Sequence, residues 1–167
     1  MTSLDQAIED FYQAFSGVPA PACVAACPCC LSAEQVKQIL KTPLREQSGD
    51  TFGHYASAAF LTVGGIPDYL YFLPRILDIT IHDGGWWPSI EVTARSIVNS
   101  GLHSWPPERR GSLDRLLRAV VQNLTDNGPY DEIDDWMCAI GKMDLDVRPY
   151  LHIIETNPDA VLDFLEV

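Results

Sequence analysis

Four of the five cysteines in this chain fall within one eight-residue stretch. They are Cys23, Cys27, Cys29 and Cys30, in the segment Pro-Ala-Cys-Val-Ala-Ala-Cys-Pro-Cys-Cys that ends at Cys30. The fifth, Cys138, is far from them in sequence. Cysteine is scarce, and its thiolate is both a soft metal ligand and a nucleophile. The clustering therefore predicts a metal-binding or redox element in a cysteine-rich loop at residues 21–31.

The spacing favours zinc as the metal. Cys27-x2-Cys30 is a common half of a zinc site, and Cys23 supplies a third ligand. The predicted metal ligands are therefore Cys23, Cys27 and Cys30. The fourth ligand stays open between Cys29, which is awkward beside Cys30 on one tetrahedral ion, and a histidine from elsewhere, such as His54.

Two other interpretations of the cluster remain open. Cys27 and Cys30 can form a redox-active dithiol, although the βαβ context of thioredoxin-like motifs is missing. Alternatively, the cysteines pack as small hydrophobic side chains in a tight loop. An iron–sulfur site of the radical-enzyme type is excluded, because those enzymes resemble α/β barrels and this chain is too short and too helical.

Acidic and aromatic residues form a second set of candidates. The acids are Asp131, Glu132, Asp134 and Asp135, in the first turn of a predicted helix. They either bind a basic partner or complement the helix dipole. Trp86 and Trp87 follow a Gly-Gly loop and act either as interface anchors or as lids over the core. These six residues are the predicted partner-binding site.

The charge balance points to the type of partner. The 167 residues include 23 acidic and 11 basic side chains, giving a net charge of −12. This charge argues against nucleic acid and favours a protein with a basic surface, although it also serves solubility alone. No apolar run reaches the roughly 18 residues of a membrane span. Because no signal peptide is evident at the start, we expect a cytoplasmic protein with reduced thiols.

No catalytic signature is present. The four histidines are scattered, and the chain has no phosphate-binding glycine motif, His-Glu-x-x-His or Gly-x-Ser-x-Gly. A protein without enzymatic activity is therefore expected. An enzyme whose site assembles only in space stays open as an alternative.

Helix signals run through almost the whole chain. Ser32 with Gln35 forms a capping-box pattern, and the strongest amphipathic stripe runs from Leu113 to Leu124. Pro74 lies inside the apolar run 69–77, where it should kink or split the helix. We predict an all-α fold in a single domain, 1–167, of eight or nine helices. Its architecture is either a helical bundle or a short stack of helix pairs.

Two motifs suggest a family. The Cys27-Pro-Cys-Cys30 segment, together with Phe72-Leu-Pro-Arg75 inside the run 68–78, resembles uncharacterised bacterial proteins with an early Cys-x2-Cys and a Phe-Leu-Pro-Arg core. That resemblance implies no activity. Within the motif, Arg75 has enough donors to satisfy backbone carbonyls or a carboxylate. More loosely, a small, acidic, helical bacterial protein looks like the immunity proteins of toxin systems.

The leading functional prediction is an acidic binding protein, of the immunity or antitoxin type, that blocks a basic toxin domain. The alternative is a small zinc-binding or thiol-redox protein that works through the cysteine cluster.

Overall fold

The computed structural model describes residues 3–165, apart from the side chain of Leu165. Within this range the chain forms nine α-helices, two short 3-10 helices and no β-strand, which confirms the all-α prediction. The helices are α1 (Ser3–Phe15), α2 (Ala33–Lys41), α3 (Gly49–Ala58), α4 (Ile66–His82), α5 (Ile90–Asn99), α6 (Pro107–Asn127), α7 (Glu132–Lys142), α8 (Arg148–Ile154) and α9 (Pro158–Leu165). The 3-10 helices are η1 (Leu44–Glu46) and η2 (Leu102–Ser104).

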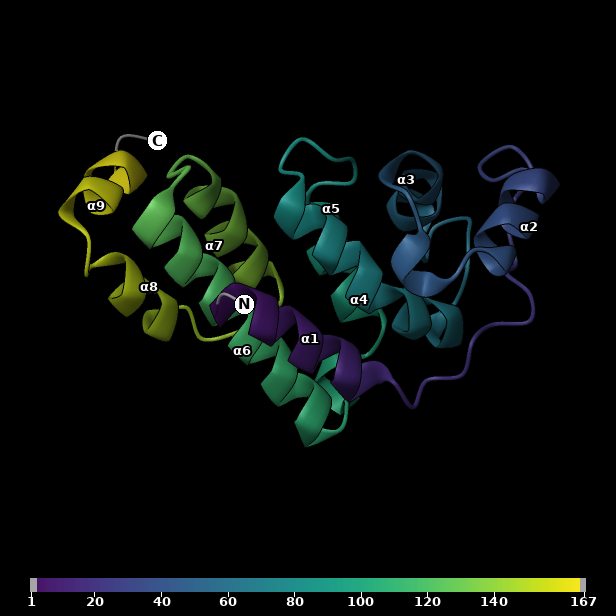
Figure 1. Cartoon of the computed structure of the whole chain (residues 1–167), viewed down its shortest axis with the longest axis horizontal. Coiled ribbons are helices and arrows are strands. Elements are labelled where there is room, and N and C mark those ends of the chain that lie inside the picture. The colour runs from purple at the N-terminus through teal and green to yellow at the C-terminus, as the bar shows by residue number, and fades with distance from the viewer. Residues whose placement is uncertain (1–2, 166–167) are drawn as a thin grey trace.

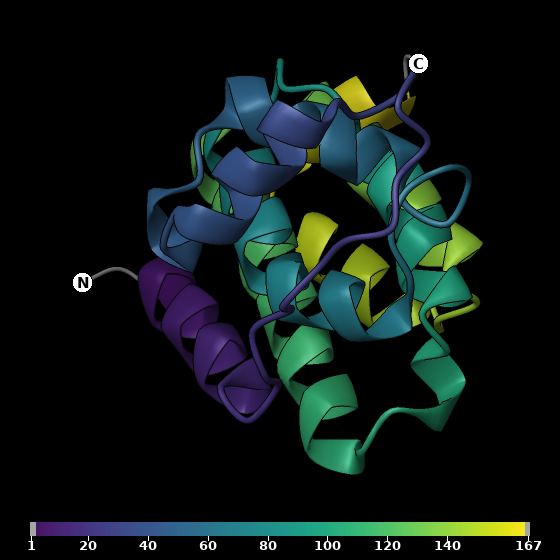
Figure 2. The same cartoon turned by 90° about the vertical axis from the view of Figure 1, so that its right-hand side faces the viewer.

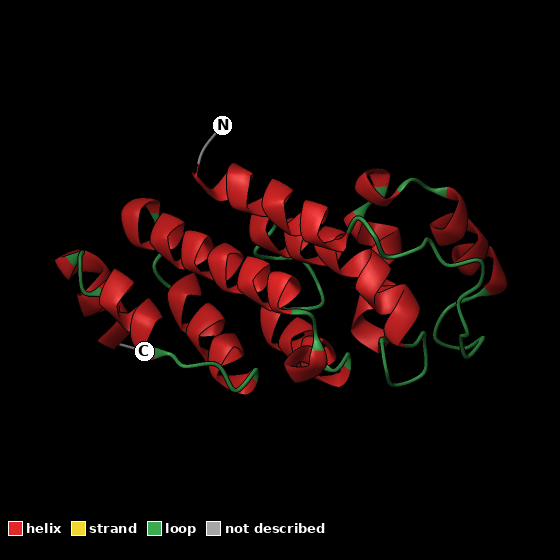
Figure 3. Cartoon of the chain, turned by 90° about the horizontal axis from the view of Figure 1, so that it is seen from below, coloured by secondary structure: helices red, strands yellow, loops and turns green. Residues whose placement is uncertain are grey.

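The helices form an elongated stack of two rows (Figures 1 and 3). In one row α3 packs on α5 and α5 on α7, and in the other α4 packs on α1, α1 on α6 and α6 on α8. Consecutive helices connect the rows, because α4 contacts α5 and α6 contacts α7. This arrangement corresponds to the predicted stack of helix pairs, with one addition. The first helix is inserted between α4 and α6, far from its neighbours in sequence.

The core follows the predicted apolar stripes. On α6, the whole predicted stripe is buried, namely Leu113, Leu116, Leu117, Val120, Val121 and Leu124. This face contacts α1, α7 and α8, so the longest helix organises one half of the stack. Each fully buried side chain of this size stabilises the fold by about 1.5–3 kcal/mol.

The helix α4 continues through Pro74 without a break, so of the two predicted effects of this proline, a kink or a split, the split is excluded. Proline removes one backbone hydrogen bond, but the flanking turns bury Phe72, Leu73 and Ile76 in the core. Burial of these side chains offsets the lost bond and keeps the helix whole. Arg75 bonds as predicted, donating from Nε and Nη2 to the carbonyl of Gln47 and from Nη1 to a carboxylate, that of Asp78.

Candidate functional site

The cysteine-rich segment crosses one end of the stack between α1 and α2 (Figure 2). Two backbone hydrogen bonds hold it against the turn between α3 and α4: Cys27 N–H donates to the Thr62 carbonyl at 2.9 Å, and Gly64 N–H donates to the Ala25 carbonyl at 2.7 Å. The flanking Val24 and Leu31 side chains are buried. The segment is therefore anchored on both sides of the cysteines.

The three cysteines nearest α2 sit on one tight turn. The N–H groups of Cys30 and Leu31 both donate to the Cys27 carbonyl, at 2.9 and 3.0 Å. The Sγ atoms of Cys27 and Cys29 are 2.7 Å apart, and those of Cys29 and Cys30 are 3.7 Å apart. All three sulfur atoms lie within 4.8 Å of one another. This turn, residues 27–30, is called the thiol turn below.

The thiols on this turn influence one another. A hydrogen bond from the Cys29 thiol, together with the backbone N–H groups of Cys29 and Cys30, lowers the pKa of Cys27. Hydrogen bonds with Cys27, the larger effect, and with Cys30 raise the pKa of Cys29 to about 11. Of these two thiols, Cys27 is therefore the more readily ionised.

The group of sulfur atoms that the structure gathers differs in one member from the metal ligands predicted by spacing. The structure brings Cys27 and Cys30 together with Cys29, whereas Cys23 is exposed and lies outside the group. No histidine or carboxylate among the described residues joins the three sulfur atoms. His54, the other predicted fourth ligand, instead lines a surface groove beside the two neighbouring tryptophans.

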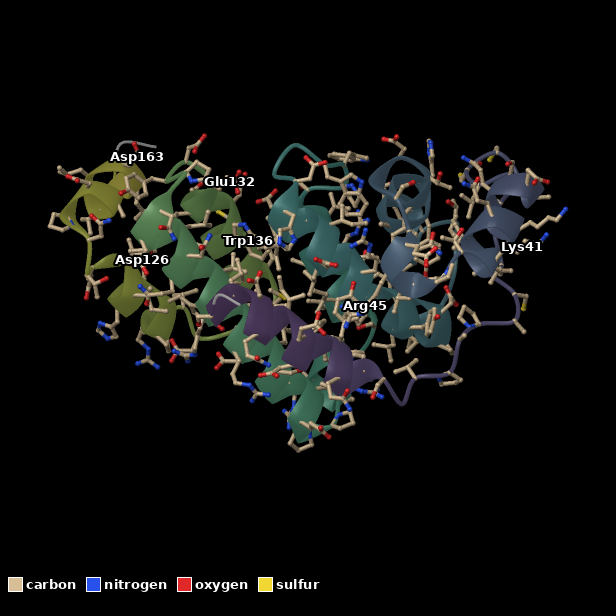
Figure 4. All side chains as sticks on the ribbon, viewed as in Figure 1. Lys41, Arg45, Asp126, Glu132, Trp136 and Asp163 are labelled. Carbon is tan, nitrogen blue, oxygen red and sulfur yellow. The ribbon has the colours of Figure 1, made fainter. Side chains whose placement is uncertain are left out.

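The acidic and tryptophan candidates meet on a different part of the molecule. The loop between α4 and α5 lies above α5 at the upper edge in Figure 1, and the backbone of Gly84 in this loop lies directly against the carboxylate of Glu132. A small cavity of about 30 Å³ at this contact is lined by Trp86, Asp135 and Trp136, among others. The loop therefore bridges to the first turn of α7, and Figure 4 shows Glu132 at this edge.

The two neighbouring tryptophans have different roles. Trp86 donates from Nε1 to the Gly49 carbonyl at 2.9 Å, and its ring covers Gly49 and Gly53 on α3. The half-buried Trp86 side chain therefore acts as a lid over α3. The Trp87 side chain is 63% exposed and projects over an open groove of about 520 Å³. The groove is lined in part by Asp50, His54 and Asp83.

Trp86 lines both the groove and the small cavity, so the two lie next to each other. We call the residues beside them the acidic edge: Asp50, Asp83, Trp87, Glu132, Asp135 and Asp131, whose charge acts on Glu132. None of its carboxylates takes part in an ion pair with another described side chain. Partial burial, with added repulsion from Asp131 and Asp135, raises the pKa of Glu132.

Asp134 is directed elsewhere than the other acids of its helix turn. Both of its carboxylate oxygens lie 3.9 Å from the Sγ atom of Cys138, one turn further along α7. The charges of Asp134 and of Glu91 on α5 contribute to raising the pKa of Cys138, after the larger effect of burial. Asp134 thus faces the α5 side of α7.

Sequence reasoning missed Asp50 and Asp83 as members of this surface. Aspartate is common at helix starts and in loops, so neither residue stands out in the sequence. The only sequence signal for their proximity was the Gly-Gly-Trp-Trp segment, since glycine permits close approach between backbone segments.

Comparison with protein-family models, curated proteins and solved structures finds no match for this chain. In the part of the chain that the structure describes, no helix combines the length and the apolar character needed to cross a membrane.

Proposed function

We propose that this chain binds a protein partner with a basic surface through the acidic edge, without catalysing a reaction. One observation carries the proposal: an exposed tryptophan and unpaired carboxylates from three separate elements lie side by side. Trp87 and Asp83 come from the loop after α4, Asp50 from α3, and Glu132 from the start of α7.

The chemistry of the edge suits cationic side chains. Its carboxylates form no ion pair with any side chain that the structure describes, so binding to lysine or arginine requires no such pair to be broken. An exposed tryptophan ring beside a carboxylate attracts a cation through its π face, by about 0.5–1 kcal/mol at exposed sites. The net charge of −12 adds long-range attraction that accelerates the encounter with a basic partner.

The chain would act as a stoichiometric blocker, of the immunity or antitoxin type, in the cytoplasm. In this role the carboxylates set the association rate and the orientation of the partner. Trp87 supplies the apolar anchor at the centre of the contact, where binding energy is usually concentrated.

A matched pair of triple variants tests the proposal. The edge variant is Asp131→Asn, Glu132→Gln and Asp135→Asn. The control variant is Glu34→Gln, Glu108→Gln and Asp159→Asn, which removes the same number of charges, also from the first turns of helices. The tagged chain first captures partners from its native cells, and the basic protein recovered in equal amount is then purified.

The rate of association with this purified protein is measured for each variant at several salt concentrations. The edge variant should associate about tenfold more slowly at low salt and show a weaker salt dependence, whereas the control should stay close to the wild type. Trp87→Ala should mainly accelerate dissociation. Equal rates for the edge and control variants would overturn the proposal, as would recovery of no basic protein.

A further inference from the structure

We propose that the thiol turn binds one soft, thiophilic cation through the three thiolates of Cys27, Cys29 and Cys30. One coordination position stays open to solvent. The proposal rests on the position of the sulfur atoms, which all lie within 4.8 Å of one another on four consecutive residues. The adjacent Cys29 and Cys30, which looked awkward as joint ligands in the sequence, have their Sγ atoms 3.7 Å apart, a separation that suits two ligands of one tetrahedral ion. The proposal concerns a site separate from the acidic edge and does not depend on the proposed function.

The backbone holds this site in place before any ion arrives. Cys27 is fixed at its N–H by Thr62 and at its carbonyl by the N–H groups of Cys30 and Leu31. Immediately after the turn, Leu31 is only 1% exposed, and Ser32 caps α2 in a complete capping box with Gln35. The ion therefore meets ligands that are already gathered, which limits the ordering entropy that binding costs.

The donor set selects the class of ion. Only sulfur atoms make up the group, and sulfur ligands favour soft cations such as Cu(I) and Zn(II) over Mg²⁺ or Ca²⁺. A closed structural zinc site has four protein ligands, whereas three ligands with an open position are typical of sites that exchange a bound molecule. The exposed position of Cys29 gives an ion a direct path from solvent.

Binding involves no change of oxidation state. Each thiol that forms a metal–sulfur bond releases its proton to solvent, so the affinity rises with pH. Two other cysteines provide internal controls: Cys23 lies outside the group, and Cys138 is a separate thiol on α7.

The test uses the reduced, full-length chain under anaerobic conditions, with Zn(II) alone or Cu(I) alone competing against a chromophoric chelator. One ion per chain is expected. Replacing Cys27, Cys29 or Cys30 with serine should lower the metal affinity by more than about a hundredfold. This exceeds the loss that is usual for a residue that only hydrogen-bonds to a metal ligand. Cys23→Ser and Cys138→Ser should change the metal affinity by less than about twofold, because substitutions outside the group act independently of it.

Two readouts separate the ions and guard against misfolding. Co(II), a spectroscopic substitute for zinc, should give sulfur-to-metal charge-transfer absorption that weakens in each of the three serine variants. A preference for Cu(I) over Zn(II) would assign the site to copper, and the reverse to zinc. Circular dichroism should show unchanged helicity in all five variants, because the substituted side chains are exposed or half-buried.

The proposal fails if neither ion binds at one per chain. It also fails if Cys29→Ser leaves the affinity unchanged, or if Cys23→Ser weakens binding as much as Cys27→Ser. Rapid formation of a disulfide within the turn, with no metal affinity in the reduced protein, would replace it with a redox element.

Discussion

The hydroxyl group of Tyr55 donates a 2.7 Å hydrogen bond to the Oδ2 atom of Asp68 inside the core. The other oxygen of Asp68 accepts the N–H of Gly65, so this carboxylate both starts α4 and ties it to α3. Burial raises the pKa of Tyr55, with added repulsion from Asp68, so the phenol remains a donor at every physiological pH. The same turn supports the cysteine-rich segment through Gly64.

Tyr55→Phe should therefore destabilise the fold by about 2 kcal/mol, because one oxygen of a buried carboxylate loses its partner. Urea unfolding measures the difference. Tyr71→Phe, on α4, is the control. The Tyr71 side chain is half-exposed, so water can bond its hydroxyl group, and the substitution should cost less than about 0.5 kcal/mol. Similar losses for the two variants would show that the Tyr55 hydrogen bond contributes little.

Gly64→Ala should be more costly than a matched change elsewhere. Gly64 has a φ of +68°, and a Cβ atom there would collide with the Oδ2 atom of Asp68. Gly101 has a φ of +83° but open space around it. Gly101→Ala should cost about 1–2 kcal/mol from backbone conformation alone.

The added collision should raise the cost of Gly64→Ala to about 3 kcal/mol or more. Both values come from urea unfolding of the two variants side by side. The difference between them isolates the steric contribution, and its absence would mean that the Asp68 side chain moves aside freely.

Glu9→Gln should give a pH-dependent loss of stability. Glu9 forms two hydrogen bonds with Arg45, at 2.6 and 2.8 Å, which connect α1 to η1. The hydrogen bond from Arg45 lowers the pKa of Glu9. Because the folded pKa lies below the unfolded one, the ion pair stabilises the fold above the unfolded pKa and loses this effect as the pH falls.

Since the Glu9 side chain is 45% exposed, the expected loss at pH 7 is only about 0.5 kcal/mol. It should shrink as the pH falls through the folded pKa and vanish once both states are protonated. Urea unfolding of the wild type and the variant, at pH 7 and at acidic pH below the unfolded pKa, checks this. An equal loss at both would show that the effect comes from packing and not from charge. The packing in question is that of the Arg45 guanidinium over the Tyr12 ring.

Replacing the two adjacent tryptophans one at a time should distinguish the role of Trp86 as a lid on the core from that of Trp87 as an anchor for a partner. Trp86→Ala removes the ring that covers two glycines of α3 and should cost about 2–3 kcal/mol, below the full value for a buried aromatic side chain. Trp87→Ala should change the stability by less than about 0.5 kcal/mol. Thermal unfolding measures both. A large loss for Trp87→Ala would show that this side chain serves the fold.

The helices were predictable because their apolar residues repeat at helical spacing, as the buried stripe from Leu113 to Leu124 confirms. The local pattern left open whether Pro74 kinks or splits its helix, because proline disfavours helix interiors, and burial of Phe72 and Ile76 outweighed that preference. Tertiary packing of this kind cannot be predicted from a short stretch of sequence.

The site was only partly predictable for related reasons. Spacing identified the cysteine stretch but could not show that the chain turns sharply enough after Cys27 to gather Cys29 and move away from Cys23. The contact between Gly84 and Glu132 joins segments 48 residues apart, so no local pattern records it.

The insertion of α1 between α4 and α6 has a consequence for synthesis. The helix α1 leaves the ribosome well before α6, its main packing partner, and the hydrogen bond from Arg109 to the Ala14 carbonyl joins residues 95 positions apart. Until α6 is made, the apolar faces of Phe11 and Phe15 lack their final cover. Such distant pairing raises the relative contact order, which slows folding compared with helical proteins whose contacts are local. The helix α1 therefore waits for α6 before its apolar face is fully covered.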